Sequence, residues 1–334
     1  MFGLFGASAF DPQQIPDLFD KVIIVTGGNA GLGYESIIHL APHHPSKIYL
    51  CARSQAKYDA AMKGITAAVP AAADFVKFLQ LDLTSLSSVH SAAQTFLSEN
   101  TRLDILMNNA GIMAQPPGLT QDGYEIQFGT NHLGHFLLTK LLLPLLLSTA
   151  QQAGTTTGTR IINLTSEGHK FAPRTAGFLP STCTTPMSEY STWTRYGQSK
   201  LCNILFTTEL ARRYPHSSSR LTAVSIHPGG VSTNLANSFA DQHPWLTRMV
   251  WPVYQLFATR PSEGALNQTW ACVAPVEGME GEGEGKAGLM KSLRQGGYYV
   301  PVAKEGGLSR WAADKDLAVQ LWEWSEGELA KLGY

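Results

Sequence analysis

The sequence has little charge, little cysteine and no long apolar run, and each shortage excludes a class of protein. Only 15% of the 334 residues are charged and the formal net charge is -1. We therefore expect neither nucleic acid nor an anionic membrane surface as a partner. The four cysteines show neither close pairing nor the spacing of a metal site. This pattern favours free thiols, a reducing compartment, a cytoplasmic location and no bound metal.

Segments that would enter a membrane are also missing. The first ten residues are apolar but lack the basic start and longer apolar core of a signal peptide. The most apolar run, residues 141–147, contains Pro144, whereas a membrane-spanning helix needs about 20 apolar residues. We expect no integral membrane segment and interpret this run as part of a buried helix.

Short apolar, β-branched runs instead alternate with helical patterns along the chain. The expected strands are residues 21–26, 47–52, 75–82, 103–111, 160–166, 221–229 and 296–302. The expected helices between them are residues 32–40, a helix that follows the second strand and ends at about residue 68, and residues 85–99, 123–149 and 194–214. This alternation is typical of βαβ units with a parallel sheet. We predict one domain over residues 1–334, with a doubly wound, Rossmann-type α/β fold and a seven-stranded parallel sheet.

The first predicted strand runs directly into the glycine-rich segment TGGNAGLG, residues 26–33. Glycines let a backbone turn tightly and approach a pyrophosphate, whose charge is stabilised by the start of the following helix. The segment stands between a buried strand and a helix, as a dinucleotide-binding loop requires. The residues expected to contact the cofactor are Gly27, Asn29, Gly31, Leu32 and Gly33.

The TGxxxGxG spacing resembles that of the short-chain dehydrogenase/reductase family. Further segments are similar to its retinol dehydrogenase and WW-domain-oxidoreductase branch: NNAG (108–111), NHLGHFLLT (131–139), SKLCNILFTTELARR (199–213), HPGGVST (227–233) and LWEWS (321–325). The sequence departs from that branch in having no N-terminal membrane anchor and in carrying extra residues at 276–288. These departures argue against a membrane location and a retinoid substrate. We interpret the C-terminal tryptophans as packing of a final helix against the sheet.

The end of the second predicted strand bears on the choice between NAD and NADP. An acidic residue there would bind the adenosine ribose and select NAD. This sequence has Arg53 and no nearby carboxylate, and a guanidinium binds a phosphate through two hydrogen bonds. We therefore expect NADP(H), although Arg53 as a solvated residue at a helix start is the alternative.

The family resemblance implies further contacts to the cofactor. Asp82 resembles the aspartate that meets the adenine amino group, and the NNAG turn lines the cofactor. The additional residues implied in this way are Leu83, Asn109, Ala110, Gly111, Pro228, Gly229, Val231 and Thr233. Single residues of this set have ordinary structural explanations, such as a helix N-cap for Asp82.

Four residues form the candidate catalytic set: Asn131, Ser166, Tyr196 and Lys200. Tyr196 and Lys200 are four apart on a predicted helix, so their side chains leave the same face. Hydride transfer to a ketone creates negative charge on oxygen, which a tyrosine can protonate. An ammonium at about 4 Å would lower the pKa of Tyr196 by roughly three units at an effective dielectric of 20.

The resemblance assigns the other roles. Lys200 would also hold the nicotinamide ribose, Ser166 rather than Thr165 would bind the substrate oxygen, and Asn131 would interrupt its helix and hold a water molecule. We expect residues 167–193 and 232–260 to cover the substrate, because the first is rich in loop-forming residues and the second contains an apolar stretch.

These observations predict an NADP(H)-dependent oxidoreductase that interconverts a carbonyl and an alcohol on a fairly apolar small molecule. A homodimer or homotetramer is expected, because the two long helices carry more apolar surface than one sheet face needs. Two alternatives remain: a regulatory protein that only binds the cofactor, and an enzyme that uses the same tyrosine for cyclisation or isomerisation.

Overall fold

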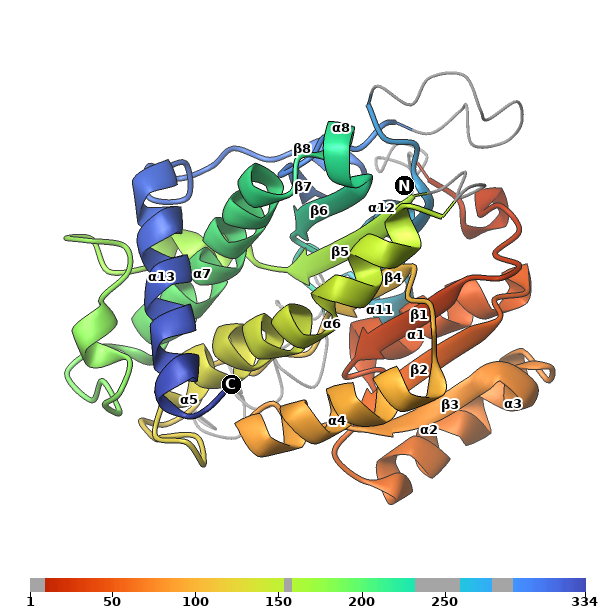
Figure 1. Cartoon of the computed structure of the whole chain (residues 1–334), viewed down its shortest axis with the longest axis horizontal. Helices are drawn as coiled ribbons and strands as arrows, with labels where there is room; N and C mark the ends of the chain where they lie inside the picture. The colour runs from red at the N-terminus through yellow and green to blue at the C-terminus, as the bar shows by residue number, and fades with distance from the viewer. Residues whose placement is uncertain (1–9, 153–157, 232–258, 278–290) are drawn as a thin grey trace, which may run out of the picture.

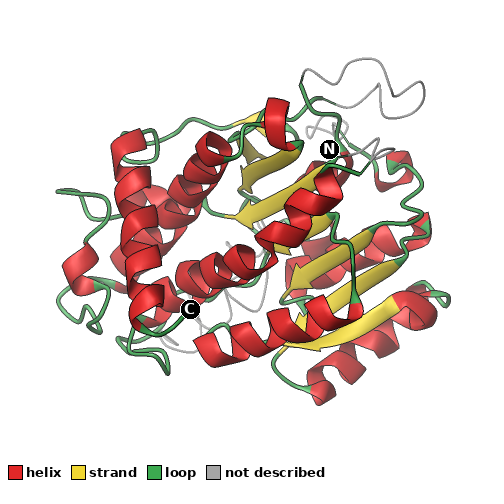
Figure 2. Ribbon diagram, in the orientation of Figure 1, coloured by secondary structure: helices red, strands yellow, loops and turns green. Residues whose placement is uncertain are grey.

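A computed structural model of the chain describes residues 10–152, 158–231, 259–277 and 291–334, and its centre is one twisted sheet (Figures 1 and 2). The sheet has eight strands in the order β3-β2-β1-β4-β5-β6-β7-β8. The strands are β1 Val22–Thr26, β2 Lys47–Ala52, β3 Val76–Gln80, β4 Ile105–Asn108, β5 Thr159–Leu164, β6 Leu221–Ile226, β7 Tyr298–Val300 and β8 Lys304–Glu305. Every residue of β1 is buried, as expected for a strand covered on both faces.

The doubly wound α/β prediction is confirmed, but the strand number is eight rather than seven. Strands β1 to β7 pair in parallel, whereas β8 pairs antiparallel with β7 through Val300 and Lys304. β8 is only two exposed residues long, so it has no apolar pattern that a sequence reading would detect. The strand order reverses between β1 and β4, and ligands of such sheets bind at the carboxyl ends of the strands at this point.

Helices cover both faces of the sheet, and each face has its own hydrophobic core. In Figure 1, α4, α6 and α7 lie in front of the sheet and α1, α2 and α12 behind it. The helices are α1 Gly31–Leu40, α2 Gln55–Ala68, α3 Ala72–Phe75, α4 Leu86–Glu99, α5 Ile126–Phe128, α6 Gly134–Ala150, α7 Thr192–Arg213, α8 His216–Ser219, α11 Pro261–Gly264, α12 Leu266–Val273 and α13 Lys315–Lys331. Both cores lie against the central strands, so the strand ends are held rigidly.

The helix expected over residues 123–149 is interrupted near its start. A π-helical segment, Gly129–Leu133, joins α5 to α6, and the N–H of Gly134 bonds to the carbonyl of Gly129, five residues back. We call this segment the bulge; it carries Asn131. The stretch Ile126–Ala150 is long and apolar enough to cross a bilayer, but 67% of its most apolar window is buried inside the fold. We interpret it as a core helix.

The C-terminal helix α13 packs on α7 rather than directly on the sheet. The ring of Trp322 contacts Phe206 at 5.8 Å between centroids, and the Arg213 guanidinium lies 4.6 Å from the centre of the Trp322 ring. α13 therefore covers apolar surface of α7 that was expected to serve subunit pairing. Partly exposed Leu141 and Leu145 leave α6 as the candidate surface for a homo-oligomer.

Residues 167–193 contain two short 3-10 turns, Glu167–Phe171 and Pro180–Thr182, and are firmly anchored. Phe178, Cys183 and Met187 are buried, and the backbone N–H of Leu179 donates to Gln198 Oε1 on α7 at 3.1 Å. The loop-rich composition thus accompanies a packed segment. The second expected substrate cover, residues 232–260, lies outside the described residues except for its last two.

Candidate functional site

The glycine loop, residues 26–33, fits closely against the turn that follows β4. Gly27 has a φ of +65°, and a Cβ atom at this position would come within 3.0 Å of the Ala110 Cβ. A Cβ at Gly33 would lie 2.7 Å from the Gly27 carbonyl oxygen. Helix α1 begins within the loop at Gly31. Only glycine allows this close passage of the loop, the turn and the helix start.

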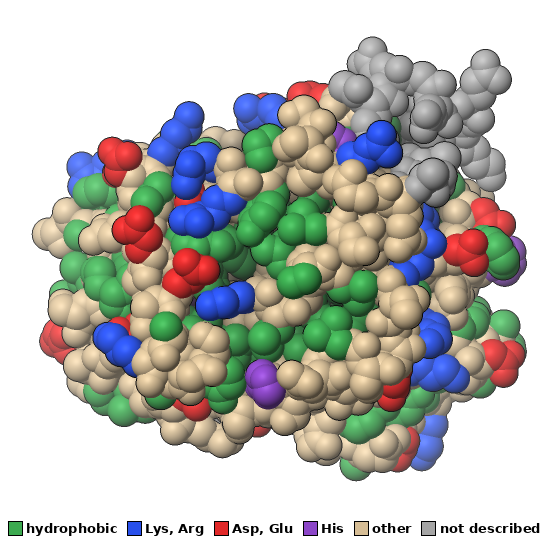
Figure 3. Space-filling view, in the orientation of Figure 1, with side chains coloured by type: hydrophobic (Ala, Val, Ile, Leu, Met, Phe, Trp, Pro, Cys, Tyr) green, Lys and Arg blue, Asp and Glu red, His purple; other side chains and the backbone are tan. Residues whose placement is uncertain are grey.

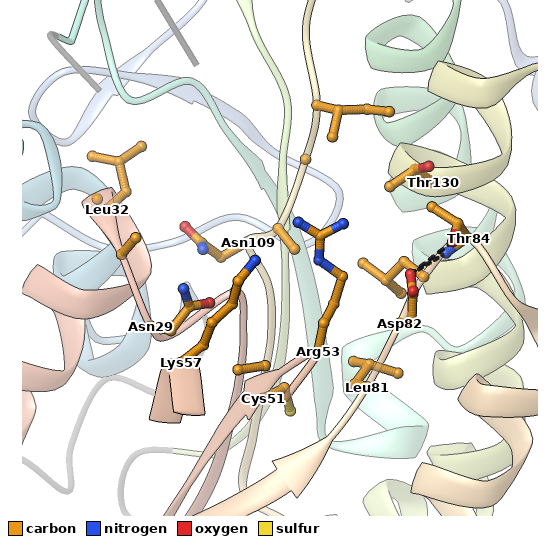
Figure 4. A pocket seen from close by; sticks show the side chains of 18 of the residues that line it. Asn29, Leu32, Cys51, Arg53, Lys57, Leu81, Asp82, Thr84, Asn109 and Thr130 are labelled. Carbon is orange, nitrogen blue, oxygen red and sulfur yellow. Dashed lines mark hydrogen bonds between the residues drawn. The ribbon is translucent and has the colours of Figure 1, made fainter. Parts of the chain in front are cut away.

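A cleft of about 360 Å³ opens at the carboxyl ends of β1, β2, β3 and β4. Its walls come from the loops after these strands, as Figure 4 shows. Ten of the residues predicted to bind cofactor line it: Gly27, Asn29, Gly31, Leu32, Arg53, Asp82, Leu83, Asn109, Ala110 and Gly111. The sequence prediction and the cleft thus coincide at the point where the strand order reverses.

Two cations line one side of this cleft. Arg53 follows β2, and Lys57 lies four residues later in the first turns of α2. Both side chains extend into the pocket (Figure 4) and both are exposed. Within the described part of the chain, neither has a carboxylate partner within 4.0 Å. This side of the cleft therefore presents unneutralised positive charge.

Asp82 follows β3, the neighbour of β2 in the sheet, and Arg53 lies between it and Lys57 in Figure 4. Its Oδ1 accepts hydrogen bonds from the backbone N–H and the hydroxyl of Thr84, at 3.0 and 2.8 Å. These bonds fix the carboxylate at the rim of the cleft, between Leu81 and Leu83, which also line it. A planar group with an exocyclic amine would find a fixed acceptor and apolar walls here.

Six of the predicted cofactor residues that the structure describes do not line this cleft, and two of them, Tyr196 and Lys200, lie on α7. Gly33 packs behind the loop, and Pro228, Gly229 and Val231 follow β6 on the other side of the carboxyl edge. Gly229 has a φ of +93°, and Val231 pairs with Thr259 in an isolated bridge. Thr233 lies outside the described residues.

The first turns of α7 bring Tyr196 and Lys200 towards Ser166, which follows β5. The Ser166 hydroxyl accepts from the Gly168 N–H at 3.0 Å and also bonds to Tyr196. A Cβ at Gly168 would come within 2.9 Å of the Tyr196 ring, so the glycine permits this approach. Thr165, the neighbouring candidate, instead donates its hydroxyl to the Lys200 carbonyl at 2.7 Å.

The pKa of Tyr196 differs from the expectation. Burial raises it to about 12, and the hydrogen bond from Ser166 only partly opposes that rise. The expected effect of Lys200 is not present: its Nζ lies 5.9 Å from the Tyr196 ring centre and donates to the Leu164 carbonyl at 3.1 Å. Burial also lowers the pKa of Lys200 to about 8. Desolvation of both groups thus outweighs their attraction.

Asn131 joins the bulge to its surroundings. Its Oδ1 accepts from the Ile112 N–H at 2.8 Å and its Nδ2 donates to the Ile112 carbonyl at 2.9 Å. Nδ2 also donates to Ser199 Oγ at 2.9 Å, and Ser199 in turn donates to the Tyr196 carbonyl at 2.8 Å. The side chain of Asn131 is therefore a structural link between the cleft wall and α7.

The catalytic candidates meet the cleft at Gly111. A Cβ built there would lie 3.2 Å from Asn131 Oδ1 and 3.3 Å from Lys200 Nζ. Gly111 and Ile112 both line the cleft. The structure thus brings Asn131, Ser166, Tyr196 and Lys200 together at the end of the cleft that lies away from Arg53.

Several residues of the site were missed from the sequence. Lys57 had a signal in its spacing of four from Arg53, and Ser199 stands beside Lys200 on the buried face of its helix. Thr26 and His135 are buried polar residues that bond to each other at 2.9 Å. Gln268, on α12, donates to Asn109 Oδ1 at 3.1 Å, a long-range contact without a local signal. Among the described residues, no cluster of three or more metal-ligating side chains is present.

Known proteins share both the sequence and the fold. A family model described as short chain dehydrogenase matches residues 21–176. The short-chain dehydrogenase/reductase drtF of Aspergillus calidoustus is 37% identical, over 96% of this chain and 97% of its own length. Retinol dehydrogenase 11 of Mus musculus is 38% identical over 78% of this chain and 75% of its own. The crystal structure of an uncharacterized protein from Mycobacterium paratuberculosis is 29% identical, with a TM-score of 0.67 over 96% of this chain and 97% of its own.

Proposed function

Because the chain belongs to the short-chain dehydrogenase/reductase family, we propose that it reduces a carbonyl on a fairly apolar small molecule with NADPH. It is an oxidoreductase of a family that acts on alcohol and carbonyl groups with a nicotinamide cofactor. The observation that carries the finer proposal is the buried group Ser166, Tyr196 and Lys200, which meets the cleft at Gly111.

The residues of the cleft fit a dinucleotide. The glycine loop lines the cleft through Gly27, Asn29 and Gly31 at the start of α1, where backbone N–H groups can meet a pyrophosphate. Asp82 would hold the adenine end, and Gly111 leads to Lys200, which would hold the nicotinamide ribose. When bound, the cofactor supplies the hydride.

The cation pair Arg53 and Lys57 supports NADP(H) over NAD(H). Both lie after β2, where the adenosine ribose of a dinucleotide arrives in such folds. A 2′-phosphate there would gain a charge-assisted contact from the guanidinium and attraction from the ammonium. Among the described residues that line the cleft, the only carboxylate is Asp82. It is bonded to Thr84 and forms no ion pair with Arg53 or Lys57 within 4.0 Å.

Tyr196 is the proposed proton donor. Because burial raises its pKa to about 12, the phenol keeps its proton at neutral pH and can transfer it to an oxygen that becomes negative. The Ser166 hydroxyl, bonded to Tyr196, would bind the same substrate oxygen. With its pKa lowered to about 8, Lys200 remains mostly protonated at pH 7 and stabilises the developing charge.

Reduction of a carbonyl uses the protonated phenol, the form in which burial holds Tyr196. Oxidation of an alcohol would begin from the Tyr196 phenolate, which burial disfavours.

The side of the site that would receive the substrate is apolar. Trp193 lies one turn before Tyr196, with its ring perpendicular to the tyrosine ring at 6.5 Å between centroids, and Met113 continues the cleft wall past Gly111. All four cysteines are buried and unpaired, which supports a reducing, cytoplasmic location.

A panel of apolar ketones, aldehydes and alcohols, followed by NADPH absorbance and by product mass, tests the proposal. Reduction adds two hydrogens to the product, whereas isomerisation leaves the mass unchanged. Loss of turnover in Tyr196→Phe with NADPH binding retained supports the assignment. A cofactor-binding protein without turnover on any compound, or turnover without a mass change, would overturn it.

A further inference from the structure

A buried histidine bridges the glycine loop and the bulge. His135 lies in the first turn of α6 and is 2% exposed. Its Nε2 is 2.9 Å from the hydroxyl of Thr26, and its Nδ1 is 3.0 Å from the Asn131 carbonyl oxygen. Burial lowers the pKa of the imidazole to about 4, and the charge of Lys200 acts in the same direction. The ring is therefore neutral at physiological pH.

The hydrogen bonds of Thr26 fix the direction of this bridge. The Thr26 hydroxyl accepts from the backbone N–H groups of Asn109 and Ala110, both at 2.9 Å. With its acceptor positions used, it has one proton to donate, and His135 Nε2 at 2.9 Å is a better acceptor than the Met107 carbonyl at 3.4 Å. The imidazole proton then sits on Nδ1 and is donated to Asn131.

The two ends of the bridge belong to different parts of the site. Asn109 and Ala110, which Thr26 holds, line the cleft. Asn131 is bonded through Ser199 to the Tyr196 carbonyl on α7. One hydrogen-bonded path, which passes through the backbone of Asn131, therefore runs from the cleft wall through His135 to the helix of the proton donor.

We propose that His135 is a positioning residue that couples the cofactor cleft to the catalytic bulge through its neutral, Nδ1-protonated imidazole. Its Nε2 contact orients the Thr26 hydroxyl and so the turn that lines the cleft. Its Nδ1 group donates to the Asn131 carbonyl and so keeps the bulge in the position where the Asn131 side chain reaches Ser199. The role assumes the dehydrogenase activity proposed above, because it concerns how cofactor binding and turnover depend on each other.

Two substitutions separate the two contacts. In His135→Asn the amide nitrogen takes the place of Nδ1, so the Asn131 contact is kept and the Thr26 contact is lost. In His135→Gln the side chain reaches the place of Nε2, so the Thr26 contact is kept and the Asn131 contact is lost. His135→Phe keeps the ring volume and loses both.

We expect opposite kinetic effects from the first two variants. His135→Asn should weaken NADPH binding, measured by cofactor fluorescence, about 5- to 10-fold and leave kcat within about twofold. His135→Gln should lower kcat by a similar factor and leave the NADPH Kd nearly unchanged. His135→Phe should show both effects.

The control is His39→Asn on α1, which removes a partly buried histidine that contacts the Thr269 hydroxyl on the other face of the sheet. It should change neither value.

A purely structural histidine would give a different pattern. All three His135 variants would then lose thermal stability alone, or Asn and Gln would change kcat and Kd alike; either result overturns the proposal. If Phe fails to fold, the Asn and Gln pair still decides.

A second measurement needs no turnover and so separates this role from the proposed function. Nitrogen-15 NMR of histidine-labelled protein, with the His135 signals assigned from the Gln variant, should show the Nδ1-protonated neutral tautomer. Addition of NADPH should shift these signals. An Nε2-protonated ring, or signals that do not respond to bound NADPH, overturns the coupling. A wild-type protein that shows the expected tautomer and shift but reduces no carbonyl overturns the enzymatic function only.

Discussion

Removal of the two cations beside β2 should convert an NADPH-preferring protein into one that does not distinguish the two cofactors. Arg53 and Lys57 both line the cleft and both are exposed, so their attraction to a phosphate acts in a medium close to water. A charge-assisted guanidinium contact contributes about 2 kcal/mol. An ammonium at about 4 Å in high dielectric contributes about 1 kcal/mol for each phosphate charge.

These magnitudes translate into measurable changes. Arg53→Ala should raise the Michaelis constant for NADPH about 30-fold and Lys57→Ala about 5-fold. The double variant should reach about 100-fold, because the two contributions act on one phosphate and need not add fully. NADH, which lacks the phosphate, should be affected less than about twofold in every case.

Initial rates against cofactor concentration, at low and high ionic strength, test this reasoning. Because the cations are exposed, added salt should reduce the NADPH preference of the wild type and change the double variant little. Lys63→Ala, on the same helix but outside the cleft, should behave as wild type. A wild type that prefers NADH, or an Arg53 variant that loses both cofactors equally, refutes the phosphate role.

Three further predictions use other parts of the molecule. Tyr196→Phe should lower kcat at least about 100-fold, because it removes the proton donor, while the NADPH Kd stays near wild type; near-normal turnover would contradict the assignment. The pKa of His135 is about 4 in the folded chain and 6.5 in the unfolded chain. Acidification from pH 7 to pH 5 should therefore lower the free energy of unfolding, measured with urea, by about 2 kcal/mol through this residue alone. The unfolded chain binds more protons in this window, so stability is lost as pH falls, and His135→Gln should reduce the difference by that amount; an unchanged pH dependence in the variant would be inconsistent with this view. Finally, light scattering at micromolar concentration should give a multiple of 36.2 kDa, and Leu141→Glu on α6 should give the monomer mass; a monomeric wild type would refute the expected homo-oligomer.

The sequence predicted those parts of the fold in which burial or backbone conformation determines which residue types can occur. β1 is buried on both faces, so its residues form an unbroken apolar run, and the glycine loop needs glycine where Gly27 takes a positive φ. β8 could not be predicted in this way, because its two residues are exposed and therefore show no apolar pattern.

The site shows the same division. Arg53 could be proposed from the sequence because it stands after the second strand, where a carboxylate would select NAD and none is present. Whether the Lys57 side chain points into the cleft depends on where α2 begins, which the sequence does not show. The raised pKa of Tyr196 depends on how much water the finished structure excludes, and on Lys200 bonding to Leu164 rather than lying against the phenol. Both are properties of the packed chain.

The position of α13 after the last strand of the sheet has a consequence for biosynthesis. This helix of 17 residues contacts α7. It also contacts α5, where the Phe128 and Trp324 rings lie 5.5 Å apart, and the bulge, where His132 meets Ser325 at 3.3 Å. A growing chain can pair β1 to β6 while it is still attached to the ribosome, but its apolar α7 face stays open to water until α13 has been synthesised. That intermediate is prone to aggregation and is a natural client for chaperones. A stop codon shortly before α13 should therefore yield a chain that is recognised and degraded, although every candidate catalytic residue has been synthesised.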